Sequence, residues 1–273
     1  MEDLRDIKPQ QSIELLKSLN ILTRDGKMNQ DSRRKLKQVY HLCQLIEPYL
    51  EKALATNPRF SLVDHGAGKS YLGFILYDLF LKERGGEFYA IEHRPELIEK
   101  AKKLADTLKF DRLHFLASDI KDASDDLSLP KNVDMVTALH ACDTATDEAI
   151  LFGLKKNAQY IVMIPCCQAE VAHTLKKEKS DQLKYTLSEL WRHPIHTREF
   201  GSHLTNVLRC LLLEGMGYKV TVTELVGWEH SMKNELIMAE NIHQPKKIAL
   251  DRLEELLKTC HLESLKSRFL PII

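Results

Sequence analysis

The chain has 273 residues, 44% of them hydrophobic, which is enough to bury a substantial core. Its 39 basic and 39 acidic residues cancel, so no overall charge attracts a nucleic acid or an anionic membrane, and such a partner would need a local patch. No apolar run is long enough to span a bilayer, and the acidic start Met1-Glu2-Asp3 lacks a signal-peptide core. We therefore expect a soluble, cytoplasmic protein without a membrane partner, whose oligomeric state these features do not define.

The cysteines lack the spacing of metal fingers or of secreted disulfide frameworks. We expect them to be reduced thiols. They are Cys43, Cys142, Cys166, Cys167, Cys210 and Cys260.

Residues 1–58 predict a helical extension. A short amphipathic helix is expected around residues 13–19, and a longer one from Asp31, as its N-cap, to Ala55. Between Arg24 and Lys37 six basic residues outnumber two acidic ones. This excess fits either a solvated helix face or a face that contacts the phosphates of an RNA, and the sequence leaves both open.

A glycine loop follows the first predicted strand. An apolar run from Phe60 stops at Asp64, turns through Gly66 and Gly68, and opens into a segment with apolar residues at helical spacing. In an open parallel sheet, ligands bind beyond the carboxyl ends of the strands, where glycines let the backbone approach them. We therefore expect a nucleotide-like cofactor against residues 66–68.

The spacing around the loop separates three classes of cofactor site. A phosphate-binding P-loop needs a glycine where this chain has Val63, and a dinucleotide fingerprint needs one where it has Tyr71. The remaining pattern, acidic-x-Gly-x-Gly, resembles the S-adenosylmethionine (SAM) loop of class I methyltransferases. A plain strand-to-helix connection would show the same pattern.

Strands and helices alternate from residue 59, which is typical of a parallel sheet covered on both faces. The second strand, 87–92, ends at Glu92, and the third, 113–117, is followed by Asp119. An acid at the tip of the second strand can accept both ribose hydroxyls of an adenosine. The class I resemblance implies that Asp119 binds the adenine amino group and that Ile120 packs on the ring.

The fourth and fifth predicted strands, 133–139 and 160–164, run into reactive side chains. Leu139 is followed by His140, Cys142 and Asp143, and the fifth strand leads to Cys166 and Cys167. These groups could form a zinc site, although no Cys-x-x-Cys pair is present. A thiolate could attack a nucleobase, Asp143 or His140 could act as a base toward a ribose hydroxyl, or the cysteines could be buried packing residues.

The motifs together sharpen the resemblance. Asp-His-Gly-Ala-Gly-Lys-Ser-Tyr-Leu, Leu-His-Ala-Cys-Asp and Pro-Cys-Cys are similar to a methyltransferase branch that includes predicted RNA methyltransferases, methyltransferase-like proteins and tRNA ribose 2'-O-methyltransferases. The match covers residues 60–170. It departs at Gln168-Ala169, where relatives often carry His or Tyr, and no Cys/His-rich zinc module precedes the core.

The remaining chain completes the predicted fold. Residues 168–200 are polar and charged, and we expect them to form an insertion or a long helix beside the substrate cleft. Residues 203–216 are expected to form a helix. Strands at 218–226 and 234–240 close the sheet, one of them antiparallel. The loop between them, with Trp228, His230 and Lys233, would face the acceptor.

We therefore predict an α/β fold with a doubly wound, seven-stranded, mostly parallel sheet. The expected parts are a helical extension (1–58), a SAM-binding methyltransferase domain (59–244) and a helical tail (245–273). The cofactor is SAM, and RNA, held by local basic patches, is the expected acceptor. A protein or small-molecule acceptor, a non-catalytic SAM- or RNA-binding protein and an NAD-linked oxidoreductase are the alternatives. The predicted catalytic residues are His140, Asp143 and Cys166, the cofactor-binding residues are Asp64, Gly66, Gly68, Glu92, Asp119, Ile120 and Leu139, and no metal ligand is predicted.

Overall fold

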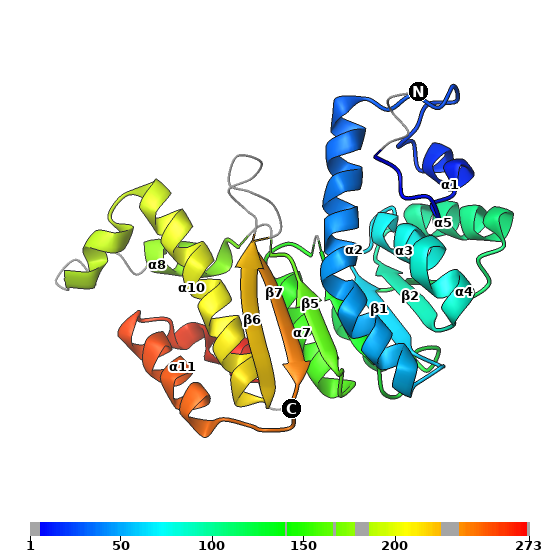
Figure 1. The fold of residues 1–273 in the computed structure, drawn as a ribbon. Coiled ribbons are helices and arrows are strands. Elements are labelled where there is room, and N and C mark those ends of the chain that lie inside the picture. Colours follow the sequence, from blue (N-terminus) through cyan, green and yellow to red (C-terminus); the bar gives the residue numbers. More distant parts are fainter. Residues whose placement is uncertain (1–5, 140, 166–167, 178–185, 225–234, 272–273) are drawn as a thin grey trace.

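A seven-stranded sheet forms the centre of the molecule (Figure 1). The computed structural model describes residues 6–139, 141–165, 168–177, 186–224 and 235–271. The strand order is β3-β2-β1-β4-β5-β7-β6, and β7 runs antiparallel to both of its neighbours while the remaining pairs are parallel. This confirms the predicted fold class. The strands are β1 Ser61–His65, β2 Glu87–Glu92, β3 Leu113–Ala117, β4 Met135–Ala138, β5 Tyr160–Met163, β6 Tyr218–Glu224 and β7 Glu235–Asn241.

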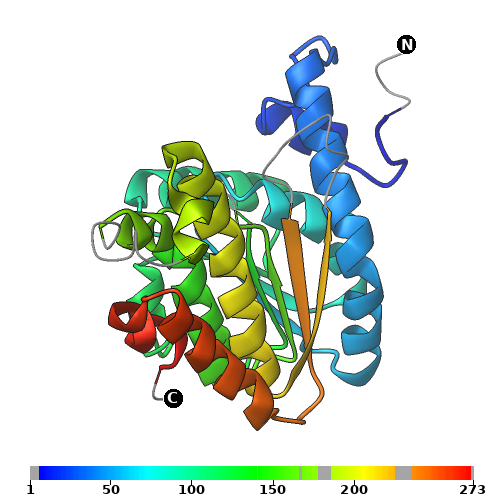
Figure 2. The same ribbon diagram turned by 90° about the vertical axis from the view of Figure 1, so that its left-hand side faces the viewer.

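Helices cover both faces of the sheet, which Figure 2 shows nearly edge-on between α2 and α10. The inner strands β1, β4 and β5 are buried on both sides. In β1, alternate residues enter two separate apolar clusters: Leu62 packs with α2, α3 and α5, and Val63 packs with α7 and α10. The helical segments are α1 Ile13–Ser18, α2 Gln30–Thr56, α3 Tyr71–Leu76, η1 Tyr77–Leu81, α4 Lys82–Arg84, α5 Pro95–Leu108, α6 Ile120–Ala123, α7 Thr144–Lys155, α8 Glu170–Lys177, η2 Thr186–Trp191, α10 Pro194–Gly215, α11 Lys247–Thr259, η3 Glu263–Leu265 and α12 Lys266–Phe269.

The N-terminal helices share a core with the sheet. Leu15 and Leu16 of α1 are fully buried in the same cluster as Phe74 of α3. The carboxylate of Asp78, in the π-helical segment η1, accepts hydrogen bonds from the side-chain amide of Gln11 and from the backbone N–H of Ser12 (2.7 Å). Asp78 therefore attaches the start of the chain to the helix that follows the glycine loop.

Strands β4 (135–138) and β5 (160–163) are shorter than the expected 133–139 and 160–164, and three other boundaries differ from the sequence-based expectation for identifiable reasons. The N-cap of α2 is Asn29, not Asp31: Asn29 is extended and its side chain accepts from Ser32 N–H at 2.8 Å, whereas Asp31 already lies in the first turn. Strand β1 continues through His65, which pairs with Ile91 of β2. Helix α10 begins at Pro194 rather than at residue 203, because proline is well suited to a first helical turn.

The C-terminal helix α11 packs on the face of the sheet opposite to α2. Leu253 and Leu257 of α11 belong to the same cluster as α10, and a Cβ at Gly215 would approach the Leu250 side chain to 2.2 Å. A side chain at position 215 would therefore displace Leu250 where α10 and α11 meet. The division of the chain at residues 58/59 and 244/245 stays a prediction. The predicted acceptor-facing loop with Trp228, His230 and Lys233 lies outside the described residues.

Replacement of Asp78 tests the attachment of the N-terminal segment. Asp78→Ala leaves the Gln11 amide and the Ser12 N–H without an acceptor, which should lower the free energy of unfolding by about 2 kcal/mol. Hydrogen exchange of residues 12–22 should accelerate more than exchange of the β1 amides. Glu83→Ala, at an exposed position on the next helical segment, is the control. Equal stability and exchange in both variants would contradict this role.

Candidate functional site

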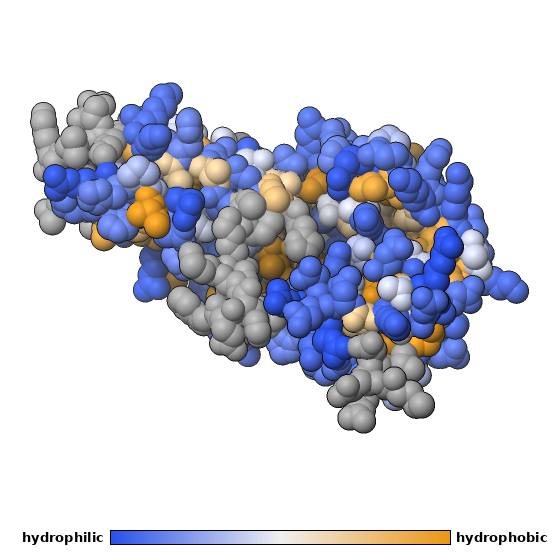
Figure 3. Space-filling model, turned by 90° about the horizontal axis from the view of Figure 1, so that it is seen from above, coloured by the Kyte–Doolittle hydropathy of each residue, from blue (hydrophilic) through white to orange (hydrophobic). Residues whose placement is uncertain are grey.

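The candidate site lies at the carboxyl edge of the parallel strands. Glu92 pairs with Ala117 and lies one residue beyond the level of the His65–Ile91 pair, so the ends of β1, β2 and β3 meet at this edge. Figure 3 looks down on it and shows hydrophilic side chains around a central region that includes apolar residues. This is where an open α/β sheet binds ligands.

The glycine loop is tied to the tip of β2. Gly66 and Gly68 have φ values of +65° and +58°, a conformation that favours glycine. A Cβ at Gly66 would lie 3.6 Å from Ala141, so backbone conformation rather than lack of space requires this glycine. The N–H of Ala67 donates to the carbonyl of Ile91 (3.0 Å), and the N–H of Gly68 donates to the Glu92 carboxylate (2.8 Å). The loop is therefore held in an open turn above the sheet.

Glu92 is the central carboxylate of this edge and is almost fully buried. Beyond Gly68, it accepts from the backbone N–H of Arg94 (3.2 Å) and from the Arg94 guanidinium (Nε to Oε1, 2.8 Å), and His93 Nδ1 lies 2.9 Å from Oε1. Burial alone would raise its pKa, but the hydrogen bonds from Arg94 and Gly68 hold the pKa of Glu92 below its usual value. Glu92 is therefore an ionised acceptor, of the kind that suits ribose hydroxyls.

Asp64 lies within strand β1, whereas the sequence indicated that it would follow the end of this strand. It pairs with Ala90 inside the sheet, is 2% exposed, and accepts a hydrogen bond from the Thr137 hydroxyl at 2.7 Å. Burial raises the pKa of Asp64 to about 7, with the Thr137 hydrogen bond opposing the shift. Its cofactor-binding role stays a prediction.

The other predicted cofactor residues lie further along the edge. Asp119 is the N-cap residue of α6 and is exposed, with its backbone carbonyl accepting from the N–H groups of Asp122 and Ala123 while its side chain makes no capping bond. Ile120 is half-buried against the α7 side of the core, and Leu139 is buried after β4. The carboxylate of Asp119 is thus accessible to a ligand.

Asp143 joins the tips of β4 and β5. Its backbone adopts φ +53° and ψ −122°, and its Oδ1 accepts from the N–H groups of Ala169 (2.9 Å) and Glu170 (3.1 Å) at the start of α8. The carboxylate is therefore engaged in positioning the segment after β5. Of the other predicted catalytic residues, His140 and Cys166 lie outside the described residues, as does Cys167, and Cys142 is exposed.

A buried charge network, which the sequence reasoning missed, supports Asp143. Arg209 of α10 is 1% exposed and forms a bidentate pair with Asp147 (2.6 and 3.0 Å), and its Nη2 donates to the carbonyl of Asp143 at 2.9 Å. Asn206 accepts from both Arg209 and Gln168. The signal in the sequence was a single arginine within the apolar run of residues 204–213. A helix on the core therefore holds the loops after β4 and β5 together.

A metal centre has no support in the part of the chain that the structure describes: no three His, Cys, Asp or Glu side chains there could hold an ion together. None of the helices described is long and apolar enough to cross a membrane.

The buried Asp64 predicts a specific pH dependence of stability. Its pKa rises from 3.8 to about 7 on folding, so the folded state binds the proton more tightly than the unfolded chain. Between those two pH values the unfolded state loses its proton first, and the Asp64 contribution to the free energy of unfolding should fall by on the order of 4 kcal/mol. Asp64→Asn keeps an acceptor for Thr137 and removes the titration.

Urea unfolding at pH 4.5 and pH 7.5 measures the effect. The stability of Asp64→Asn relative to the unmodified chain should increase with pH, whereas Asp125→Asn, at an exposed position, should show no such change. A parallel pH dependence of Asp64→Asn and the unmodified chain would refute the buried, proton-binding state of this carboxyl.

Known proteins match this chain in sequence and in fold. Glutathione S-transferase C-terminal domain-containing proteins of Macaca fascicularis and Homo sapiens are 27% identical to it over 233 residues, 79% of this chain and 34% of theirs. The chain thus spans about a third of the length of these relatives. An O-methyltransferase from Bacillus cereus, solved in complex with SAH, has a similar fold: TM-score 0.53, 11% identity, 88% of this chain and 96% of that chain covered.

A sequence family described as "Methyltransferase domain" matches residues 34–174, slightly more than half of the chain. The matched residues include the glycine loop, Glu92, Asp119 and Asp143. The positive-φ glycines and the buried, ionised Glu92 fit an adenosine cofactor at this edge. The chain therefore belongs to the methyltransferase-domain family, with the class I fold and SAM as its methyl donor.

Proposed function

We propose that this domain transfers the methyl group of SAM to RNA. The observation that carries the choice of RNA is a group of cations beside the glycine loop. Lys35 lies over the Tyr71 ring, Lys69 and Lys100 line the same pocket as Tyr71, and none of the three pairs with an acid among the described residues. On a chain with zero net charge, unpaired cations beside the cofactor loop indicate an anionic acceptor.

Several basic residues of the face predicted between Arg24 and Lys37 lie beside acidic side chains in the structure. Arg33 and Lys37 both pair with Asp6, at 2.8 and 3.4 Å, and Arg34 lies 3.7 Å from Asp31. Lys35 instead lies over the ring of Tyr71, 3.6 Å from its centroid. Lys35 is therefore the member of this face that is directed toward the glycine loop.

The predicted cofactor contacts remain proposals, and the geometry supports them. In this proposal the backbone at Gly66 and Gly68 lies against the methionine part of SAM, Glu92 accepts from the ribose hydroxyls, and Asp119 accepts from the adenine amino group. Asp64 stays a proposed cofactor-binding residue, and Ile120 and Leu139 supply apolar contact. When bound, SAM supplies an electrophilic methyl group, so much of the catalysis would come from proximity and orientation of the acceptor.

Asp143 is proposed as the base on the acceptor side. Its Oδ1 is used by two backbone N–H groups, and Arg209 holds its carbonyl, so its orientation is set by both strand tips. Proton removal from a ribose hydroxyl would fall to the other carboxylate oxygen. His140 and Cys166 stay predicted catalytic residues.

The proposed function is tested in two incubations of the chain with methyl-labelled SAM, one containing total RNA and the other containing total protein. Label in RNA is the expected result. Label in protein alone would identify a protein methyltransferase and refute the RNA proposal, and label in neither would leave a SAM-binding protein without turnover on these macromolecules.

Glu92 and Arg94 give opposite predictions for SAM binding. Glu92→Ala removes the proposed ribose acceptor and the partner of the Gly68 N–H, so affinity should fall at least about 100-fold with the fold intact. Arg94 occupies the same carboxylate and its side chain is half exposed, so Arg94→Ala should bind SAM as tightly as the unmodified chain or more tightly. Calorimetry measures both, and unchanged affinity in Glu92→Ala would refute the ribose assignment.

Asp143 is tested with two substitutions. Asp143→Asn keeps the oxygen that accepts from Ala169 and Glu170 but cannot take up a proton, whereas Asp143→Ala removes both functions. A base role predicts that both variants lose methyl transfer by about 100-fold or more while SAM affinity stays within about twofold. Normal transfer by Asp143→Asn would show that Asp143 only positions the segment after β5.

A further inference from the structure

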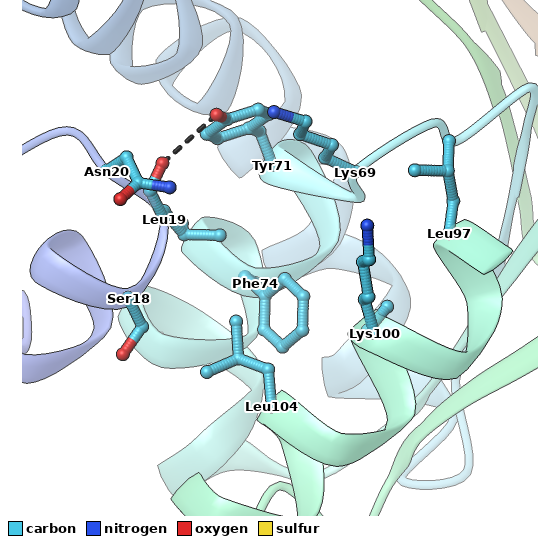
Figure 4. Close-up of a pocket in the computed structure, with 10 residues that line it drawn as sticks. Ser18, Leu19, Asn20, Lys69, Tyr71, Phe74, Leu97, Lys100 and Leu104 are labelled. Atoms are coloured by element: carbon cyan, nitrogen blue, oxygen red, sulfur yellow. Dashed lines mark hydrogen bonds between the residues drawn. The ribbon is translucent and has the colours of Figure 1, made fainter.

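A hollow of about 340 Å³ lies on the outer side of the glycine loop, between α1, α3 and α5 (Figure 4). Its lining is largely apolar, with Leu19 following α1, Leu97 and Leu104 on α5, and the buried Phe74 on α3. The N-terminal extension forms one wall, and the hydroxyl of Tyr71 donates to the Leu19 carbonyl at 3.0 Å. The hollow therefore exists because the extension docks on the SAM-binding part of the chain.

Positive charge surrounds this apolar surface. Figure 4 shows Lys69, from the loop before α3, and Lys100, from α5, reaching the same hollow from different elements. Neither forms an ion pair within the described ranges, and Lys35 contacts the Tyr71 ring next to them. Partial burial and the nearby charge of Lys69 lower the pKa of Lys35, so these cations repel one another. A bound anion would relieve that repulsion.

An apolar hollow with a cationic rim matches the two parts of a nucleotide. A base can bury its ring against aliphatic and aromatic side chains, and a phosphate can lie between ammonium groups. Entry of one base requires that it be unstacked, which single-stranded RNA allows and an A-form duplex does not. Lys69 directly follows Gly68, so a strand held here would pass beside the cofactor loop.

We propose that this hollow binds one nucleotide of a single-stranded RNA substrate, with its base on the apolar lining and its phosphate between Lys69 and Lys100. The assignment rests on the proposed function for the choice of RNA, and it adds a second contact site for that RNA outside the methyl-transfer edge. The site makes the N-terminal extension part of substrate recognition.

Binding of a fluorescein-labelled, single-stranded RNA of mixed sequence tests the site by anisotropy at several salt concentrations. Lys100→Ala and Lys35→Ala should each weaken binding by about fivefold and reduce the slope of log affinity against log salt by about 0.7. Lys102→Ala removes the same charge from an exposed position on α5 that does not line the hollow, and it is the matched control. SAM affinity, measured by calorimetry, should be unchanged in all three.

Entry of the base is tested with a charge-matched probe. An oligonucleotide with abasic sites keeps every phosphate, so it should bind the unmodified chain several-fold more weakly than intact RNA, and the difference should shrink in Leu104→Ala. Equal affinity for the two probes would overturn the base contact. Equal affinities and salt slopes for Lys100→Ala and Lys102→Ala would overturn the phosphate contact.

The outcomes separate this inference from the proposed function. If the unmodified chain methylates RNA but Lys100→Ala binds RNA normally, the function stands and the site is wrong. If the lysine variants lose RNA binding but no RNA is methylated, the nucleotide site stands and the choice of RNA as methyl acceptor is wrong.

Discussion

The hydrogen bond from the Gly68 N–H to the Glu92 carboxylate joins the two parts that a SAM site needs. Glycine at positive φ forms the turn, and a buried carboxylate at the tip of the next strand holds that turn in place. A carboxylate removed from water is stable only when its oxygens are hydrogen-bonded, and here Gly68 and Arg94 satisfy them. In the proposed function, this ionised group exchanges the half-exposed Arg94 side chain for the hydroxyls of the ligand.

The proposed acceptor side is organised by a second set of buried charges. Arg209 and Asp147 are both removed from water, which is costly unless the remaining donors find partners, and Asn206 and the Asp143 carbonyl provide them. The surrounding bonds also explain how Asp143 keeps an unusual backbone conformation between two strand tips. The proposed donor side is thus held by the glycine loop and the proposed acceptor side by α10, and the sheet sets the spacing between them.

The N-terminal extension is connected to the donor side by both packing and polar contacts. It shares an apolar core with α3 and α5, and Asp78 and Tyr71 hold its backbone against the helix that follows the glycine loop. One consequence is the lysine-rimmed hollow, which neither part could form alone. A second consequence concerns the basic residues of α2: Arg33 and Lys37 form ion pairs with Asp6, whereas Lys35 lies over the ring of Tyr71.

The sequence by itself determined the class of fold and the position of the glycine loop. The evidence for both was local: apolar segments alternate, Gly66 and Gly68 are spaced by one residue, and Glu92 ends a strand. Such patterns can be recognised in a sequence because they follow from backbone geometry and burial. Strands β2 and β3 match the predicted ranges for this reason. Only the tertiary structure decided that β1 extends through His65, that Asp64 lies inside the sheet beside Thr137, and that Arg209 supports Asp143. Each of these depends on contacts between residues more than sixty positions apart or on pairing between strands, and no local preference in the chain specifies which distant group will meet which.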